Sequence, residues 1–245
     1  MTLLAAQRSW YTVMDIDFTS LGTISLTSNG NYNIGGYTWT KGNSTNDLTP
    51  AVIDSEGLKF NPTNSNTSYD SGRTLPYIWT PLTVFSDYSI NVPISIWVYS
   101  TSNPVSEWDN VTVAVDDNSR NLGIEMSRGF FYGGQGGRST FTQSNSSVSA
   151  GSHVYTLNTS NEVQVLEFPS GISSLIWNIY KGTYGSGDFP NFSNLQITHS
   201  CRATSISYNM NAVGSMGVLL GAQRWVSATS GFIAKYKRIK IKVKN

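Results

Sequence analysis

The stretch GFIAKYKRIKIKVKN, from Gly231 to Asn245, decides how this chain folds. Basic residues alternate with apolar ones along it, but the alternation changes phase at Lys237-Arg238. One extra residue at that point, a β-bulge, would return every apolar side chain to one face of a strand. The apolar residues are Phe232, Ala234, Tyr236, Ile239, Ile241 and Val243. The stretch therefore predicts a long closing strand with a buried apolar face and with Lys240, Lys242 and Lys244 facing solvent.

Two other interpretations of this basic stretch stay open. A disordered arm that binds nucleic acid is typical of basic runs, but such arms have no core to join and lack a regular apolar pattern. The lysine row could also dock against an acidic surface of a partner protein. The strand is favoured, because lysines on an outer face also discourage edge-to-edge aggregation.

A second strand is predicted over Tyr88–Val98, where apolar and polar residues alternate. Pro93 lies within it and cannot donate to a ladder, so we expect this strand at a sheet edge or with a bulge. Another strand is predicted around Val111–Val115, followed by a turn at Asp116-Asp117-Asn118 and a return strand over Leu122–Met126.

The rest of the chain shows period two and glycine-rich turns, such as SNGNYNIGG and YGGQGGRS. This pattern is typical of an all-β protein, an antiparallel sandwich or barrel. We expect one domain over residues 11–245 and an N-terminal arm over residues 1–10. Further strands are predicted at Thr12–Phe18, Thr23–Leu26, Leu58–Phe60, Tyr77–Phe85, Val154–Leu157, Val163–Phe168, Leu175–Tyr180, Leu195–Ala203 and Gly217–Leu220.

The composition excludes several classes of protein. The net charge of +1 gives no global field that favours a polyanion, and charged residues are only 13% of the chain. The single Cys201 excludes an internal disulfide, and two histidines leave little material for a transition-metal site. Arg8 follows the short apolar run at the N-terminus, the wrong order for a secretory signal. No stretch approaches the roughly 20 apolar residues that span a bilayer, so we expect no membrane insertion.

Both ends of the chain resemble concanavalin-A-like (laminin-G-like) jelly-roll domains of phage virion proteins. In such domains an Asp-Phe strand, a Trp strand and a Gly-Leu strand open the sandwich. Here MDIDFTSLGTISL at residues 14–26, Trp39 in GGYTWTKG and EGLKF at Glu56–Phe60 follow that order. The closing GFIAKYKRIKIKV looks like the last strand of these domains, which pairs beside the first. The middle of the chain matches by strand pattern only. The resemblance implies a jelly roll of two curved sheets in a virion surface component.

Related folds include glucanases, so a hydrolytic site must be considered. Retaining hydrolysis requires two carboxyl groups about 5 Å apart. The nearest approaches are Asp54-Ser-Glu56 and Glu107-Trp-Asp109, and neither has a third carboxylate at the offset that glucanases of this fold use. We therefore expect a protein that is not an enzyme, with a divergent glycoside hydrolase as the weaker alternative.

Calcium is a candidate ligand, because the resemblance implies a calcium site at a loop rim in some relatives. Asp116, Asp117 and Asn118 offer the oxygen ligands that hard cations take. The same triplet is typical of an ordinary hairpin turn, since Asp and Asn side chains bond their own backbone. The turn is favoured, so we expect no cofactor and keep calcium as the alternative.

Two stretches rich in glycine and aromatic residues are the candidates for glycan binding. Sugars stack on flat aromatic faces and bond to a nearby carboxylate or amide. We expect GFFYGGQGG to be a loop that presents Phe131 and Tyr132, and KGTYGSGDFPN to be a loop that presents Tyr184, Asp188 and Phe189. The favoured alternative is that these aromatic residues pack on a neighbouring subunit or cap the sandwich.

These features predict a non-enzymatic virion structural protein: a capsid decoration, head fibre or tail-associated protein. We expect synthesis in the host cytoplasm, assembly into a homo-oligomer, and contact with other virion proteins, either capsid or tail subunits. Contact with host-surface polysaccharide is compatible with that role, and no nucleic-acid partner is expected. The alternative is a stand-alone, lectin-like carbohydrate-binding module.

Overall fold

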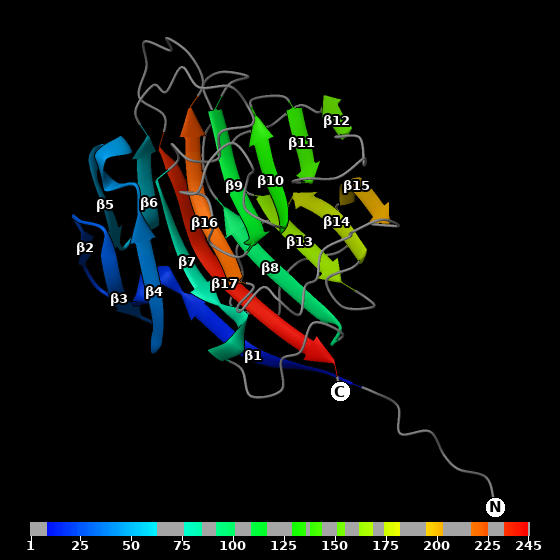
Figure 1. Cartoon of the computed structure of the whole chain (residues 1–245), viewed down its shortest axis with the longest axis horizontal. Coiled ribbons are helices and arrows are strands. Elements are labelled where there is room, and N and C mark those ends of the chain that lie inside the picture. Colours follow the sequence, from blue (N-terminus) through cyan, green and yellow to red (C-terminus); the bar gives the residue numbers. More distant parts are fainter. Residues whose placement is uncertain are drawn as a thin grey trace, which may run out of the picture.

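A computed structural model of the chain describes residues 9–62, 76–84, 92–100, 109–116, 129–135, 138–143, 151–154, 162–168, 174–181, 195–202, 217–224 and 233–244. From residue 109 to residue 202 this description covers the backbone alone. The described strands form two antiparallel sheets that pack face to face (Figure 1). The prediction of an antiparallel β-sandwich is confirmed. No helix among the described residues is long and apolar enough to span a membrane.

The two sheets have nine and eight strands among the described residues. Sheet A contains, in spatial order, β15 (Leu195–Arg202), β14 (Ser174–Lys181), β13 (Glu162–Phe168), β8 (Ile94–Ser100), β17 (Ala234–Lys244), β6 (Gly57–Pro62), β5 (Asp47–Asp54) and β2 (Ile24–Leu26), and β1 (Trp10–Asp17) also pairs with β17. Sheet B contains β12 (Gly151–Val154), β11 (Arg138–Gln143), β10 (Gly129–Gln135), β9 (Asp109–Asp116), β16 (Gly217–Arg224), β7 (Tyr77–Pro81), β4 (Tyr37–Gly42) and β3 (Gly30–Ile34). Short 3-10 turns occur at Phe18–Ser20, Ser44–Asn46 and Leu82–Val84.

The core lies between the sheets and is built from the apolar face of each. Alternate residues of a strand point to opposite faces, so the apolar side chains at every second position all reach the interior. Sheet A contributes Phe60, Ile96 and Ile241, and sheet B contributes Trp39 and Leu220, all fully buried. Ile94, Ile96 and Val98 share the core face, as the alternation predicts, and Ser95, Trp97 and Tyr99 on the opposite face of β8 are buried as well.

The C-terminal stretch is the central strand of sheet A. β17 pairs with β8 along one edge, and with β6 and then β1 along the other (Figure 1). The predicted pairing of the last strand beside the first is therefore confirmed. The register along β8 shifts between Tyr236 and Arg238, which confirms the predicted bulge. Ala234, Tyr236, Ile239, Ile241 and Val243 all belong to the core as a result, while Phe232 lies outside the described residues.

The expected solvent exposure of all three lysines is wrong for Lys240. Its relative exposure is 4%, whereas Lys242 and Lys244 are partly exposed. Lys240 faces Asp15 of β1 on one side and Trp97 of β8 on the other, because it is in register with both residues. A long side chain between two strands buries its methylene stem against such neighbours.

Pro93 does not place its strand at a sheet edge. β8 lies between β13 and β17, and it begins at Ile94, one residue after the proline. The Pro93 carbonyl accepts a hydrogen bond from the Lys244 N–H at 3.1 Å. The missing N–H is harmless there, because the ladder of β8 starts at the next residue.

Two further corrections concern sheet B. The stretch SNGNYNIGG was predicted as a turn, but Gly30–Ile34 forms β3 and pairs with β4, while Gly35 and Gly36 with positive φ make the turn between them. The strand predicted over Tyr77–Phe85 ends at Pro81, where the chain enters a 3-10 turn. Backbone pairing with a neighbour outweighs local turn propensity in β3.

Gly57 is needed where the β5–β6 hairpin meets the β17 bulge. Its φ is +107°, and a Cβ at this position would meet the backbone carbonyl oxygen of Tyr236. We expect Gly57→Ala to lower the free energy of unfolding by about 2–4 kcal/mol, from backbone strain and overpacking. Gly36→Ala is the matched control, since Gly36 also has positive φ (+85°) but open space around it, and should cost about 1–2 kcal/mol. Equal losses in urea unfolding would contradict the proposed backbone clash.

Candidate functional site

The first glycan candidates lie in a strand, not in a loop. Phe131 and Tyr132 belong to β10, which pairs with β9 on one side and β11 on the other. The glycines of GFFYGGQGG suggested a turn, but both edges of this segment are taken up by ladder hydrogen bonds, which hold it extended. The expected loop at Phe131 and Tyr132 is therefore wrong. Backbone register places Phe131 across from Ala114, whose other partner is Leu219.

The other predicted site residues stay untested. Tyr184, Asp188 and Phe189 lie outside the described residues. Asp116 is the last residue of β9 and pairs with Gly129, while Asp117 and Asn118 lie outside the description, as does the predicted return strand Leu122–Met126. Within the described part of the chain, no group of three His, Cys, Asp or Glu side chains could hold a metal ion.

The carboxylate pair at the β5–β6 turn is held by lysines. Lys59 forms ion pairs with Asp54 and, at 3.1 Å, with Glu56, and Lys235 of β17 approaches Glu56 at 2.6 Å. Hydrogen bonds from Lys235 and Lys59 lower the pKa of Glu56. Burial raises the pKa of Asp54, but the bond and the charge of Lys59, together with a hydrogen bond from the Glu56 backbone N–H, outweigh it, and the net shift is downward. A glycosidase needs a general acid with a raised pKa, so this pair lacks the required protonation.

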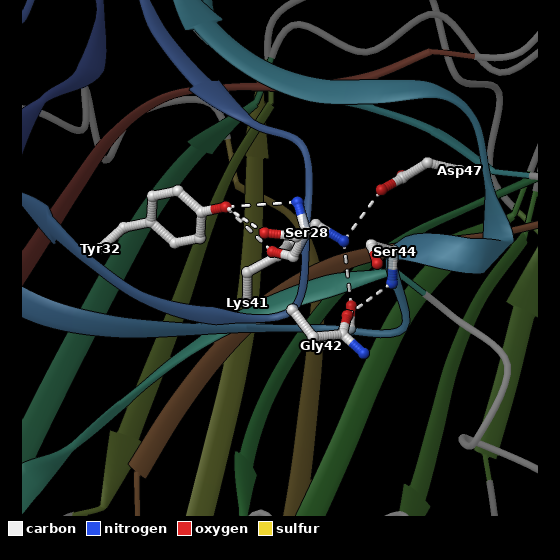
Figure 2. Close-up of polar contacts among 7 residues, drawn as sticks. Ser28, Tyr32, Lys41, Gly42, Ser44 and Asp47 are labelled. Atoms are coloured by element: carbon white, nitrogen blue, oxygen red, sulfur yellow. Dashed lines mark hydrogen bonds and ion pairs between the residues drawn. The ribbon is translucent and has the colours of Figure 1, made fainter.

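A buried ion pair joins the two sheets at one end of the sandwich. Figure 2 shows the Lys41 ammonium of β4 pointing to the Asp47 carboxylate at the start of β5, at 2.8 Å, and to the Gly42 carbonyl, at 3.0 Å. Their side chains are 0% and 1% exposed. Burial lowers the pKa of Lys41 and raises the pKa of Asp47, and the partner's charge offsets each shift in part. This enclosed pair is part of the framework and offers no surface to a ligand.

A different group of side chains gathers on the outer side of β1, β17 and β8. We call it the basic–aromatic face; it consists of Trp10, Trp97, Arg238, Lys240, Lys242 and Lys244. Trp97 and Lys240 are buried, whereas Lys242 and Lys244 are partly exposed and Trp10 is exposed. The Lys242 ammonium lies 4.0 Å from the centre of the Trp97 ring, and the Lys240 ammonium lies 5.8 Å from it. Lys244 lies 5.9 Å from the Trp10 ring. Each distance is within the range of a cation–π contact.

Asp15 is the acidic residue that faces this basic row from β1. The Arg238 guanidinium donates two hydrogen bonds to it, both at 2.6 Å, and Lys240 approaches at 3.4 Å. Partial burial raises the pKa of Asp15, but Arg238 and Lys240 outweigh it, and the net shift is downward. The lysine alternation was evident in the sequence, but its partners Asp15 and Trp97 come from strands far away in the chain.

Asp15 should make the protein sensitive to acid. Because its pKa is lower in the folded chain, its stabilising contribution is present above the unfolded pKa and is lost as pH falls through the folded pKa. We expect the unfolding temperature of the wild type to fall more steeply between about pH 5 and pH 2 than that of Asp15→Asn. Parallel curves, measured by circular dichroism, would show that the Asp15 contacts contribute nothing to acid sensitivity.

Comparison with known proteins reveals similarity in fold. No protein-family model matches the chain, and a search of curated proteins finds no match. The CBM2 module of the evolved Dit of Lactobacillus casei BL23 phage J-1 has a TM-score of 0.53 and 9% identity over 97% of each chain. An uncharacterized protein from Mycobacterium paratuberculosis has a TM-score of 0.50 and 8% identity, over 93% of this chain and 99% of that one. Winged bean acidic lectin, complexed with methyl-α-D-galactose, has a TM-score of 0.48 and 8% identity over 98% and 100%. The chain is an antiparallel β-sandwich that shares its fold with the phage Dit module.

Proposed function

We propose that this protein is a non-enzymatic, carbohydrate-binding component of a virus particle. The observation that carries the proposal is the match in fold with the carbohydrate-binding module of a phage Dit, which extends over 97% of both chains. Since a shared fold does not fix a function, the proposal also depends on the chemistry of the described side chains.

Those side chains favour binding over cleavage. The pair suggested by the sequence, Asp54 and Glu56, is held ionised by Lys59 and Lys235. Asp15 is engaged by Arg238, and Asp47 is enclosed with Lys41. None of these four carboxylates is poised to donate a proton to a glycosidic oxygen while a second one attacks.

A glycan array with the purified chain tests carbohydrate binding. We expect saturable binding to a subset of bacterial-surface polysaccharides without release of reducing sugar. Phe131→Ala and Tyr184→Ala separate the two aromatic stretches, and binding lost in either variant would assign the sugar to that stretch. Glu56→Gln is the control for hydrolysis, because reducing sugar released by the wild type and not by this variant would make the protein a hydrolase.

The virion role has its own test. A particle component built by subunit contacts should be a stable trimer or larger assembly in light scattering. Removal of residues 1–8, the part of the predicted arm (residues 1–10) that precedes the described residues, should reduce the mass of the assembly if the arm docks on a neighbour. Antibodies against the chain should label purified virus particles. A monomer that is absent from particles yet binds glycans would instead be the stand-alone lectin-like module.

A further inference from the structure

We propose that the basic–aromatic face binds an acidic polysaccharide. The inference rests on the proposed function and narrows it, because it names the ligand class and a site apart from the aromatic stretches. The face lies on the outer side of sheet A, where β17 lies between β1 and β8 (Figure 1).

The charge on this face is only partly compensated. Asp15 takes the two hydrogen bonds of Arg238 and lies 3.4 Å from Lys240. Arg238 and Lys240 thus have an acidic partner. Among the described side chains, no carboxylate lies within ion-pair distance of Lys242 or Lys244. Lys242 contacts the ring of Trp97, and Lys244 contacts the ring of Trp10. Two positive charges therefore stand beside two indoles without an anionic partner in the described part of the chain.

The spacing of these groups suits a polymer with repeated acidic groups. Lys242 and Lys244 are alternate residues on one strand, which places their Cα atoms about 7 Å apart. Trp10 is 39% exposed and lies beside Lys244 at the end of β17, where it can cover the apolar side of a sugar ring. An acidic polysaccharide supplies both a row of anions and apolar ring faces.

A nucleic acid fits this face less well. Nucleic-acid binding rests on many simultaneous phosphate contacts, whereas only two lysines of this face, Lys242 and Lys244, lack a carboxylate partner among the described side chains. An acidic protein surface would pair with the lysines but would make no use of the exposed Trp10 ring. Both are therefore treated as competing ligands in the experiment.

The experiment compares polygalacturonate with dextran, an uncharged polysaccharide of similar length, by biolayer interferometry on the full chain. We expect binding to polygalacturonate that weakens as salt rises from about 50 to 200 mM, and much weaker binding to dextran. Lys242→Gln/Lys244→Gln should weaken binding to polygalacturonate about tenfold, since two partly exposed charge contacts are lost. Equal affinity in this variant would overturn the proposal.

The matched control is Lys59→Gln/Lys235→Gln, which removes the same charge at the other end of β17 and should change affinity less than about twofold. The unfolding temperature of each variant verifies that it is folded.

Tighter binding to single-stranded DNA or to poly-glutamate of equal charge would assign the face to another ligand class and overturn the inference. If arrayed glycans bind and only Phe131→Ala or Tyr184→Ala abolishes that binding, the proposed function stands and this inference fails. If no polysaccharide of either kind binds the wild type, the proposed function itself fails.

Discussion

Replacement of Lys41 by methionine is expected to lower the free energy of unfolding by about 3–5 kcal/mol, because it leaves a buried charge without a partner. The Asp47 carboxylate is 1% exposed, and the Lys41 ammonium lies 2.8 Å from it. Methionine fills a similar volume, so the loss measures the charge and not a cavity. The same ammonium donates to the Gly42 carbonyl, which loses that bond as well. Urea unfolding followed by tryptophan fluorescence gives the difference.

Two further variants make the Lys41 result specific. The double variant Lys41→Met/Asp47→Leu should be within about 1 kcal/mol of the wild type or more stable, because an apolar pair avoids the desolvation of both charges. Lys59→Met is the surface control. Lys59 is also ion-paired, but its side chain is 18% exposed, so its loss should cost about 0–1 kcal/mol. If Lys41→Met costs no more than Lys59→Met, the pair is not buried as described.

Ile241→Asp is expected to abolish the cooperative unfolding transition. Ile241 is fully buried on β17, which is the strand that joins β1, β6 and β8. Removal of the isoleucine side chain costs about 2–5 kcal/mol, and an unpaired carboxylate in the core adds several more. Together these approach the roughly 5–15 kcal/mol that stabilise a typical domain.

The matched control for Ile241→Asp is its neighbour, Lys242→Asp. Lys242 points to the outer side of the same strand, so its replacement should cost about 1 kcal/mol and preserve the transition. The two variants give opposite results only if the C-terminal stretch is a core strand. A disordered basic arm would tolerate both changes equally, and such an outcome in thermal unfolding would contradict the strand.

The C-terminal stretch shows what local sequence can predict in this fold. The phase change at Lys237-Arg238 predicted a bulge, and the register shift between Tyr236 and Arg238 is that bulge. The prediction succeeded because one face of the strand is buried, and a slip of one residue would expose every apolar side chain. The pairing of the last strand with the first came from the family resemblance, since alternation within a strand does not specify its neighbours.

Predictions failed where a partner from elsewhere in the chain decides the structure. Lys240 is buried because Asp15 and Trp97 flank it, and nothing near Lys240 in the sequence indicates either of them. The glycines around Phe131 suggested a loop, but two neighbouring strands hold that segment extended. Pro93 predicts an edge strand or a bulge, yet β8 lies inside sheet A and begins just after the proline. In each case the pairing of a strand with its neighbours in the sheet decides the structure, and the local sequence does not.

The candidate site also depends on residues that are distant from one another in the sequence. The glycine-rich stretches predict ligand-binding residues, and the alternation in β17 predicts a structural role for its lysines. The structure supports the architectural role, since β17 is central, and it also places Trp97 4.0 Å beneath the Lys242 ammonium. Such a juxtaposition of strands distant in sequence becomes visible only once the register is known.

The central claim is that this jelly roll binds carbohydrate without cleaving it, and isothermal titration calorimetry tests that claim most directly. The polysaccharide with the strongest array signal would be titrated into the purified full-length chain. We expect a saturable isotherm whose baseline returns to its starting level after each injection. A steady heat flow that persists after each injection, together with new reducing ends, would reveal turnover and contradict the claim. The absence of any binding heat across several temperatures would contradict it as well.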